Sequence, residues 1–339
     1  MSQPSSARRL LLPLVPLYRL ALAFREFRLL VAPEQRLRFP VVSIGNLSTG
    51  GAGKTPLAIA LAQALSARGL RVDVLSRGYG RQSKLAARVL PGGSAEDFGD
   101  EPLLIARETG VPVYVAPRRY DAGALAEAEA LAGGGQGVHL LDDGFQHRQL
   151  ARDVDILLLN QRDWQDWLLP AGNLREPLEA IRRADVLAIP ANEPELEAAL
   201  HVWGWSGPVW LLRRTMDIPA VSGPVAAFCG IARPEQFFAG LKDAGLKVAL
   251  KLAFPDHFTY TQRVLEELIA DAREKEVSAI ITTDKDLVRL GELASLFPPS
   301  MPLATARLRI KIENQAEAIH WLEDRVRQSS AAESLPSRL

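Results

Sequence analysis

The hydrophobic positions of this chain fall into short continuous runs separated by helical patterns. Six runs predict strands: Val41–Ile44, Val72–Leu75, Val113–Val115, Val138–Leu141, Ile156–Leu159 and Val186–Ile189. They are continuous rather than alternating, which is typical of strands that are covered on both faces. Helical patterns lie between them, at 54–67, 101–109 and 121–132. This repetition of strand and helix predicts an α/β fold with a mostly parallel sheet and helices on both sides.

A second, smaller α/β set follows a turn-rich region at 191–208. Its apolar runs predict strands at Val225–Phe228, Val248–Leu252 and Ala279–Thr282, with helices near 233–244, 261–276 and 284–296. We therefore expect four parts: an N-terminal helix in 1–38, a core in 39–205, a C-terminal α/β lobe in 206–327 and a frayed tail in 328–339. A cleft between the two lobes is the natural place for a substrate.

Composition narrows the class of protein without identifying it. The 339 residues suit about two domains at roughly 150 residues each. A single cysteine, Cys229, excludes an intrachain disulfide and a cysteine-rich metal site. The formal net charge of zero gives no indication of nucleic-acid binding. Nothing in the composition indicates an obligate protein partner.

The zero net charge conceals a basic N-terminal arm. Residues 1–38 contain seven arginines and two acidic residues, so the remainder of the chain carries the opposite excess. From Leu17 onward, apolar side chains follow helical spacing, but Arg25 and Glu26 interrupt the run well short of the ~20 residues that a bilayer requires. One interpretation is a helix in a membrane interface with its arginines near lipid phosphates. The alternative is a helix packed on the protein's own body, and both can hold at once.

The most specific pattern is a glycine-rich loop between a strand and a helix. The segment Ser48-Thr49-Gly50-Gly51-Ala52-Gly53-Lys54-Thr55 follows the first strand of the core and opens the first helix. Glycines let several backbone N–H groups turn toward phosphate oxygens, and the helix N-terminus favours an anion. Lys54 supplies a cation for the β- and γ-phosphates, and Thr55 offers a hydroxyl to Mg²⁺. The loop predicts a P-loop nucleotide site.

Further candidate residues lie at strand ends and helix starts. Asp142 and Asp143 end an apolar strand, where P-loop enzymes hold or orient Mg²⁺. Asp100 opens a helix, so it is either a helix cap or a carboxylate that takes the proton of an acceptor hydroxyl. His257, in a loop of the second lobe, is either solvated or reaches Asp100 if the lobes close.

Four more polar segments remain open in function. Arg77 and Tyr79 lie in a glycine-flanked turn after the second core strand, which suits an anionic sugar or lipid phosphate, or is simply a flexible turn. The segment 282–286 is either a helix cap or a nucleotide contact. Polar character of the same kind marks 142–148 and 174–177.

Together these motifs resemble the tetraacyldisaccharide 4′-kinase family of lipid A biosynthesis. The matching segments run in family order from about residue 41 to 290: GNLSTGGAGKTP, SRGYGR, GDEP, LDDGFQHR, LPAGNLREP, DHF and TTDKD. The resemblance implies transfer of a phosphoryl group from Mg²⁺-bound ATP to the 4′-hydroxyl of a tetraacylated glucosamine disaccharide 1-phosphate, which gives lipid IVA. It also implies a peripheral protein at the cytoplasmic face of the Gram-negative inner membrane, in contact with an anionic lipid surface.

The same resemblance implies roles for individual residues. Asp100 paired with His257 would be the catalytic base, and Lys54 would act on the transferred phosphate. The metal region would include Thr55, Asp142, Asp143 and Glu176. The substrate region would include Arg77, Tyr79, Arg119, His147 and Arg175, although Arg118 competes with Arg119 for the family position.

Two other classes of function remain as alternatives. A P-loop nucleotide switch, an ATPase acting on a membrane partner, would hydrolyse ATP without a lipid acceptor. The guanine motif of a GTPase is missing, since Thr283-Asp-Lys-Asp286 has the wrong order. A non-catalytic peripheral membrane protein would bind liposomes through its arm but would have no saturable nucleotide site.

Overall fold

The computed structural model describes residues 8, 10–31, 33–51, 53–132 and 137–333. Within these ranges the strands form one sheet in the order β10-β9-β11-β12-β8-β7-β6-β1-β5-β2-β4-β3. The strands are β1 (Val41–Asn46), β2 (Val72–Ser76), β3 (Ala87–Arg88), β4 (Val113–Val115), β5 (Val138–Asp142), β6 (Val154–Leu158), β7 (Val186–Pro190), β8 (Val209–Asp217), β9 (Val225–Cys229), β10 (Val248–Ala253), β11 (Ala279–Thr283) and β12 (Leu303–Ile312). The mixed, mostly parallel α/β sheet confirms the predicted fold class.

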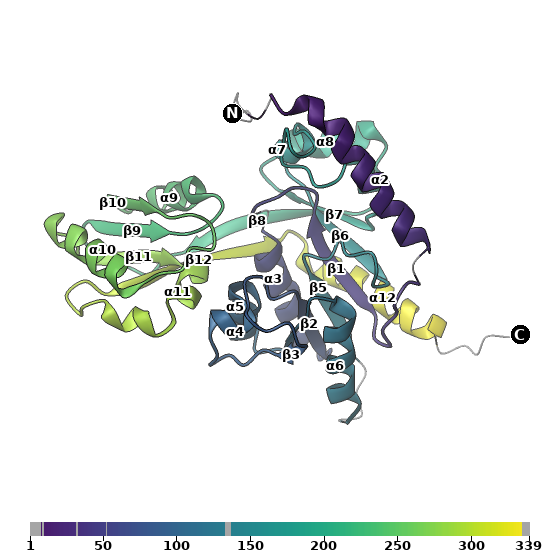
Figure 1. Ribbon diagram of the computed structural model, residues 1–339, viewed down its shortest axis with the longest axis horizontal. Helices are drawn as coiled ribbons and strands as arrows, with labels where there is room; N and C mark the ends of the chain where they lie inside the picture. The colour runs from purple at the N-terminus through teal and green to yellow at the C-terminus, as the bar shows by residue number, and fades with distance from the viewer. Residues whose placement is uncertain (1–7, 9, 32, 52, 133–136, 334–339) are drawn as a thin grey trace, which may run out of the picture.

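Helices surround this sheet on both faces (Figure 1). The α-helices are α2 (Val15–Val31), α3 (Lys54–Ala67), α4 (Ala95–Phe98), α5 (Asp100–Thr109), α6 (Arg119–Ala132), α7 (Gln161–Trp164), α8 (Pro194–Trp203), α9 (Pro234–Asp243), α10 (Gln262–Glu274), α11 (Asp284–Leu290) and α12 (Gln315–Glu333). Three short 3₁₀ helices are η1 (Leu12–Leu14), η2 (Leu178–Arg183) and η3 (Gly291–Leu296).

The larger lobe is built on β1, which pairs in parallel with β5 and β6. Neighbouring residues of its strands belong to cores on opposite faces. Val42 packs in a cluster with α3, α5 and α12, whereas Val41 packs in a cluster with α6. Likewise Ala188 joins the first of these clusters, and Leu187 joins another with α8. Burial on both faces explains why these strands appear as continuous apolar runs in the sequence.

The smaller lobe contains β9, β10 and β11 in parallel pairing. Its two faces are covered by α9, through Phe237 and Leu241, and by α10, through Leu265 and Leu268. The antiparallel pair β8 and β12 runs from one lobe to the other, with Arg214 opposite Ile310 (Figure 1). The two lobes are therefore joined by continuous sheet.

The expected boundaries differ from the structure at the C-terminal end. The range 206–327 is not one lobe, because β8 and β12 connect the lobes and α12 returns to the core of the larger one through Ile319 and Leu322. The tail expected from 328 is still helical as far as Glu333, and 334–339 lie outside the described residues. The sequence pattern did not predict β12 as a strand, because charged side chains at alternate positions interrupt its apolar residues.

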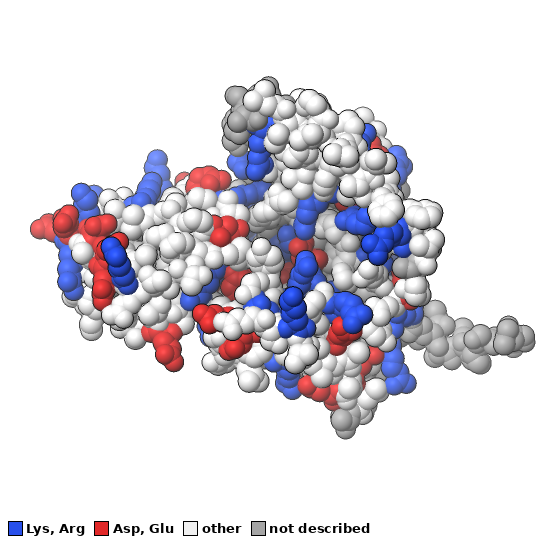
Figure 2. All heavy atoms as spheres, in the orientation of Figure 1, with Lys and Arg blue, Asp and Glu red and all other residues white. Residues whose placement is uncertain are grey.

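Helix α2 packs on the larger lobe by one side only. Val15, Tyr18 and Leu22 contact the core cluster that includes α8. On the outer face, five apolar residues are each between 61% and 68% exposed: Leu17, Leu20, Phe24, Phe27 and Val31. Figure 2 shows a largely uncharged surface along this helix. Within the described ranges, no helix is both long enough and apolar enough to cross a bilayer.

One glycine allows strand β1 to approach the segment after β5 closely, which gives a testable prediction of stability. A Cβ on Gly45 would lie 2.4 Å from the Cβ of Phe145 and 2.8 Å from its backbone nitrogen. Because backbone must move, Gly45→Ala is expected to lower the free energy of unfolding by about 1–3 kcal/mol in urea denaturation. The control is Gly92→Ala, at an open position with nothing within 4 Å. Equal midpoints for the two variants would contradict the close packing.

Candidate active site

The glycine-rich loop that is expected to bind phosphates links β1 to α3, as the sequence predicts. Its Gly50 and Gly53 both have φ of 95°, a left-handed conformation that disfavours any side chain. Helix α3 begins at Lys54 directly after Gly53, so the first backbone N–H groups of the helix are directed toward the loop. Ser48 and Thr55 are buried at the two ends of the loop. The expected contact at Ala52 lies outside the described residues.

Lys54 is held in a compact group of charged and amide side chains. Its Nζ donates to Asn46 Oδ1 at 2.9 Å and lies 3.4 Å from Asp143 Oδ1. Arg175 donates to both oxygens of Asp143, at 3.1 and 3.2 Å, and to the same oxygen of Asn46. Burial alone would raise the pKa of Asp143, but the charges of Lys54 and Arg175 outweigh it and hold that pKa well below its usual range. Two expected site residues, Lys54 and Arg175, thus meet on one carboxylate.

Asp142 is the carboxylate suited to a cation. It ends β5 and is 1% exposed, and neither of its carboxyl oxygens has a hydrogen-bond partner among the residues that the structure describes. Burial, together with the charges of Glu101 and Asp143, raises the pKa of Asp142 to about 7. A buried, unpaired carboxyl group next to a P-loop is the donor chemistry that Mg²⁺ accepts. Among the described residues, however, His, Cys, Asp and Glu form no ready group of three for a metal.

Glu176 differs from the expectation that it belongs to the metal region. Its side chain is 3% exposed, and its two oxygens accept from Arg25 at 2.6 Å and from Arg183 at 2.5 Å. Each oxygen already faces a cation, so the residue ties α2 to the loop that carries Arg175. Tyr18 strengthens this connection by donating to the carbonyl oxygen of Arg175 at 2.9 Å.

Asp100 and His257 come from different lobes and lie in contact. Asp100 is the first residue of α5, where its Oδ1 accepts from the backbone nitrogen of Glu101 at 2.9 Å. Its Oδ2 lies 3.1 Å from Nδ1 of His257, which sits in a loop of the smaller lobe with φ of 58°. The structure therefore brings together the pair that was expected to meet only on closure.

Sequence reasoning missed the cations that accompany this pair. Arg289 of α11 donates to Asp100 Oδ2 from Nε at 2.8 Å and from Nη2 at 2.5 Å. Lys285, one turn earlier on α11, pairs with Glu101. The i, i+4 spacing of Lys285 and Arg289 beside the TTDKD segment was the available signal. In that segment Thr283 caps α11, which agrees with the helix-cap interpretation.

The expected substrate residues line the same region. The ring of Tyr79 lies 5.2 Å from the ring of His257. Arg119 is buried, and its Nε has no hydrogen-bond partner within the described part of the chain. Burial lowers the pKa of Arg119 to about 10 against the opposing charges of Asp143 and Asp142. Arg118 is exposed and pairs with Asp121 at 3.2 Å, so Arg119 is the inward residue of the two.

His147 and Arg77 belong to the same electrostatic environment. Burial, followed by the charges of Arg119 and Arg152, lowers the pKa of His147 to about 4, so its imidazole is neutral at pH 7. Arg77 adds to this lowering and is itself exposed. A neutral histidine among arginines can donate to or accept from a polar ligand without adding charge.

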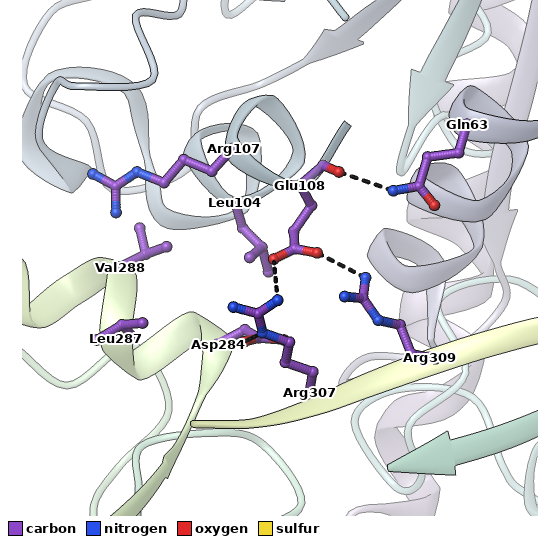
Figure 3. Close-up of a pocket in the computed structure, with 9 residues that line it drawn as sticks. All are labelled: Gln63, Leu104, Arg107, Glu108, Asp284, Leu287, Val288, Arg307 and Arg309. Carbon is purple, nitrogen blue, oxygen red and sulfur yellow. Dashed lines mark hydrogen bonds and ion pairs between the residues drawn. The ribbon is translucent and has the colours of Figure 1, made fainter. Parts of the chain in front are cut away.

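A separate cavity of 470 Å³ lies at the far end of α5, between α3, α11 and β12 (Figure 3). Glu108 contacts Arg309 at 2.7 Å and Arg307 at 3.9 Å there. None of the expected site residues that the structure describes lines this cavity. It marks a second set of ion pairs between the lobes rather than the candidate active site.

Comparison with known proteins gives a consistent result. The family model described as Tetraacyldisaccharide-1-P 4'-kinase (LpxK) matches residues 7–327. The chain is 41% identical over 296 residues to a tetraacyldisaccharide 4'-kinase of Koribacter versatilis, covering 84% of this chain and 88% of the relative. It is 40% identical over 307 residues to one of Anaeromyxobacter dehalogenans, covering 83% and 78%.

A solved structure extends the similarity to the fold. LpxK from Aquifex aeolicus, crystallised in complex with ATP, is 34% identical and superposes with a TM-score of 0.74. The match covers 94% of this chain and 99% of that one. Because the family model spans almost the whole sequence and these relatives match most of it, this chain belongs to the tetraacyldisaccharide 4′-kinase family.

Proposed function

We propose that the two lobes phosphorylate the 4′-hydroxyl of tetraacyldisaccharide 1-phosphate with ATP, the step of lipid A biosynthesis that forms lipid IVA. One observation carries the proposal for the site: Asp100 and His257 meet next to the acids that follow β5. Glu101 is near enough to raise the pKa of Asp142, and Lys54 lies 3.4 Å from Asp143. An acceptor-activating pair and a phosphate-binding loop thus share one site.

The nucleotide end of this site is the P-loop. We infer that backbone N–H groups of 48–55 and the ammonium of Lys54 bind the phosphates of ATP. The Thr55 hydroxyl and the unpaired carboxylate of Asp142, with Asp143 beside it, would hold Mg²⁺. When bound, this ion neutralises charge on the phosphate oxygens. Phosphoryl transfer requires mainly positioning and charge neutralisation, which these groups supply.

The acceptor end is the pair from the two lobes. Asp100 and His257 act together as the base that takes the proton of the 4′-hydroxyl. Around them, Arg77, Tyr79, Arg119, His147 and Arg175 offer cationic and amphipathic side chains to an anionic, acylated sugar. Glu176 supports this end indirectly, by fixing the loop that carries Arg175.

The substrate's acyl chains remain in a bilayer, so the protein must come to it. We infer peripheral association with the cytoplasmic face of the Gram-negative inner membrane through the exposed apolar face of α2. Arg19 and Arg28 on this helix would add attraction to anionic lipids, at roughly 1 kcal/mol each near the surface. The opposite face of α2 packs on the protein, so both expected roles of the arm coexist.

Label transfer distinguishes a kinase from a nucleotide switch. Incubation with γ-labelled ATP, Mg²⁺ and the disaccharide 1-phosphate should place the label on the lipid. A nucleotide switch would instead release labelled inorganic phosphate at the same rate with or without the lipid. The comparisons do not favour the switch.

Removal of the P-loop lysine tests the nucleotide end. Lys54→Ala is expected to reduce label transfer at least about 10²-fold, because the variant loses the cation facing the phosphates. Lys84→Ala, at an exposed lysine, is the matched control and should transfer label at the wild-type rate. Near wild-type transfer by Lys54→Ala would refute the assignment of the loop.

Substitution of the acceptor carboxylate tests the other end. Asp100→Asn keeps the shape of the side chain but removes its charge, so kcat is expected to fall about 10²–10⁴-fold. ATP affinity, measured by titration calorimetry, should stay within about twofold of wild type, because ATP phosphates bind elsewhere. A collapse of ATP affinity would instead make Asp100 a structural or metal-binding residue.

Membrane association is tested on the exposed face of α2. The double substitution Phe24→Ser and Phe27→Ser is expected to weaken co-sedimentation with anionic vesicles at least about 10²-fold, since each phenylalanine contributes about 1.5–3 kcal/mol when buried. Val202→Ser, at a 91% exposed apolar residue of α8, is the control and should sediment as wild type. Unchanged sedimentation of the double variant would rule out this face.

A further inference from the structure

Arg289 is buried at the junction of the two lobes, in contact with the acceptor-activating pair. Its side chain is 6% exposed and comes from α11 of the smaller lobe. Nε and Nη2 both donate to Oδ2 of Asp100, the oxygen that also lies 3.1 Å from Nδ1 of His257. Three nitrogen atoms thus converge on one carboxylate oxygen.

The guanidinium is fixed from its other side by a buried polar network. Nη1 of Arg289 lies 3.1 Å from Oδ1 of Asp286 and also contacts the carbonyl oxygen of Gly230. Asp286 is fully buried, and its Oδ1 also accepts from the backbone nitrogen of Gly230 at 3.0 Å and from the hydroxyl of Tyr260 at 2.9 Å. Thr283 donates to Oδ2 of Asp286 at 2.6 Å. A planar guanidinium held in this way has one orientation.

This arrangement leaves Asp100 little capacity to accept a further proton. Oδ2 is filled by three nitrogens, and Oδ1 accepts from the backbone of Glu101. Burial alone would raise the pKa of Asp100, but the hydrogen bond with His257 and the charge of Arg289 hold it well below its usual range. The Nε2 atom of His257, by contrast, lies 3.9 Å from Oδ2 of Asp256, which is beyond hydrogen-bond distance.

We propose that Arg289 is a positioning residue for phosphoryl transfer: it holds the carboxylate of Asp100 in one orientation against Nδ1 of His257, so that the pair is set to take the hydroxyl proton. The proposal rests on the proposed kinase function. In the step, the sugar oxygen forms a bond to the γ-phosphorus while the bond to the β,γ-bridging oxygen breaks, and its electron pair leaves with ADP. The hydroxyl proton moves to the pair and is later released to solvent.

The sign of the pH dependence follows from the groups that face His257. These are Asp100 of α5, Asp256 of the same loop, Arg289 of α11 and the ring of Tyr79. The hydrogen bond with Asp100 raises the pKa of His257 above its ordinary 6.5, whereas burial and the charge of Arg289 lower it. Because only neutral His257 can accept a proton, kcat should fall as pH falls through this pKa. Removal of the Arg289 charge should move the fall to higher pH.

The experiment compares pH profiles of kcat for label transfer by the full-length protein. Arg289→Met is expected to lower kcat at least about tenfold and to shift the acidic limb upward by about one pH unit, since a like charge has been removed next to the imidazole. Arg289→Lys keeps the charge but lacks the planar fork, so its kcat should fall while its acidic limb stays near the wild-type position. ATP affinity should be unchanged in both.

Arg309→Met is the matched control. Arg309 lies on β12, which connects the lobes, and it pairs with Glu108 of the same helix, α5, in the cavity of Figure 3. The substitution removes this ion pair. If any lost contact between the lobes were sufficient to impair catalysis, this variant would resemble Arg289→Met. We expect its kcat within about twofold of wild type and its acidic limb unmoved.

Each alternative outcome leads to a different conclusion. An Arg289→Met profile that is reduced at every pH without a shift of the limb would leave Arg289 a structural residue only. A wild-type profile that stays flat down to pH 5 would exclude His257 as the proton acceptor. If Arg289→Met does not fold, as judged by circular dichroism, Arg289→Gln replaces it, with the same expected shift. Absence of label transfer by the wild-type protein would refute the proposed function itself.

Discussion

The geometry of the site depends on the ion pairs between α11 and the N-terminus of α5. Lys285 and Arg289 stand one turn apart and bind Glu101 and Asp100, which are adjacent in the sequence. Acidic residues are favourable at a helix N-terminus on their own account, because the backbone N–H groups there have no partners. The two cations of α11, from the other lobe, form ion pairs with this acidic helix end. The contact that joins the lobes therefore also sets the charge state of Asp100.

Much of the larger lobe could be predicted because its signals are local. Strands covered on both faces appear as continuous apolar runs, and β4 (Val113–Val115) begins and ends where its run does. The phosphate-binding loop was equally evident, since Gly50 and Gly53 adopt conformations that few other residues tolerate. The position of Asp142 at the end of a core strand was equally local, since P-loop enzymes place an acid there near Mg²⁺. These inferences require only a residue and its neighbours in sequence.

The remainder depends on contacts between distant segments, which a single sequence does not display. Arg289 lies 189 positions from Asp100, and although its spacing from Lys285 indicates a pair of cations on one helix face, it does not indicate their partner. The family resemblance placed Glu176 in the metal region, whereas its carboxylate pairs with Arg25 and Arg183, which come from outside the matching motif. The strand β12 was missed because its charged side chains interrupt the apolar pattern, although Ile310 and Ile312 are core residues.

At the P-loop, the two cationic side chains are both paired with the same carboxylate and the same amide oxygen. Asp143 binds both Lys54 and Arg175, and Asn46 accepts from the same two side chains. Without these acceptors, two cations would stand side by side in a partly buried site, at a large electrostatic cost. A bound triphosphate offers more negative charge than one carboxylate, so it can compete for both cations. The carboxylate then released lies directly beside Asp142, where a divalent cation accompanying the triphosphate would compensate it.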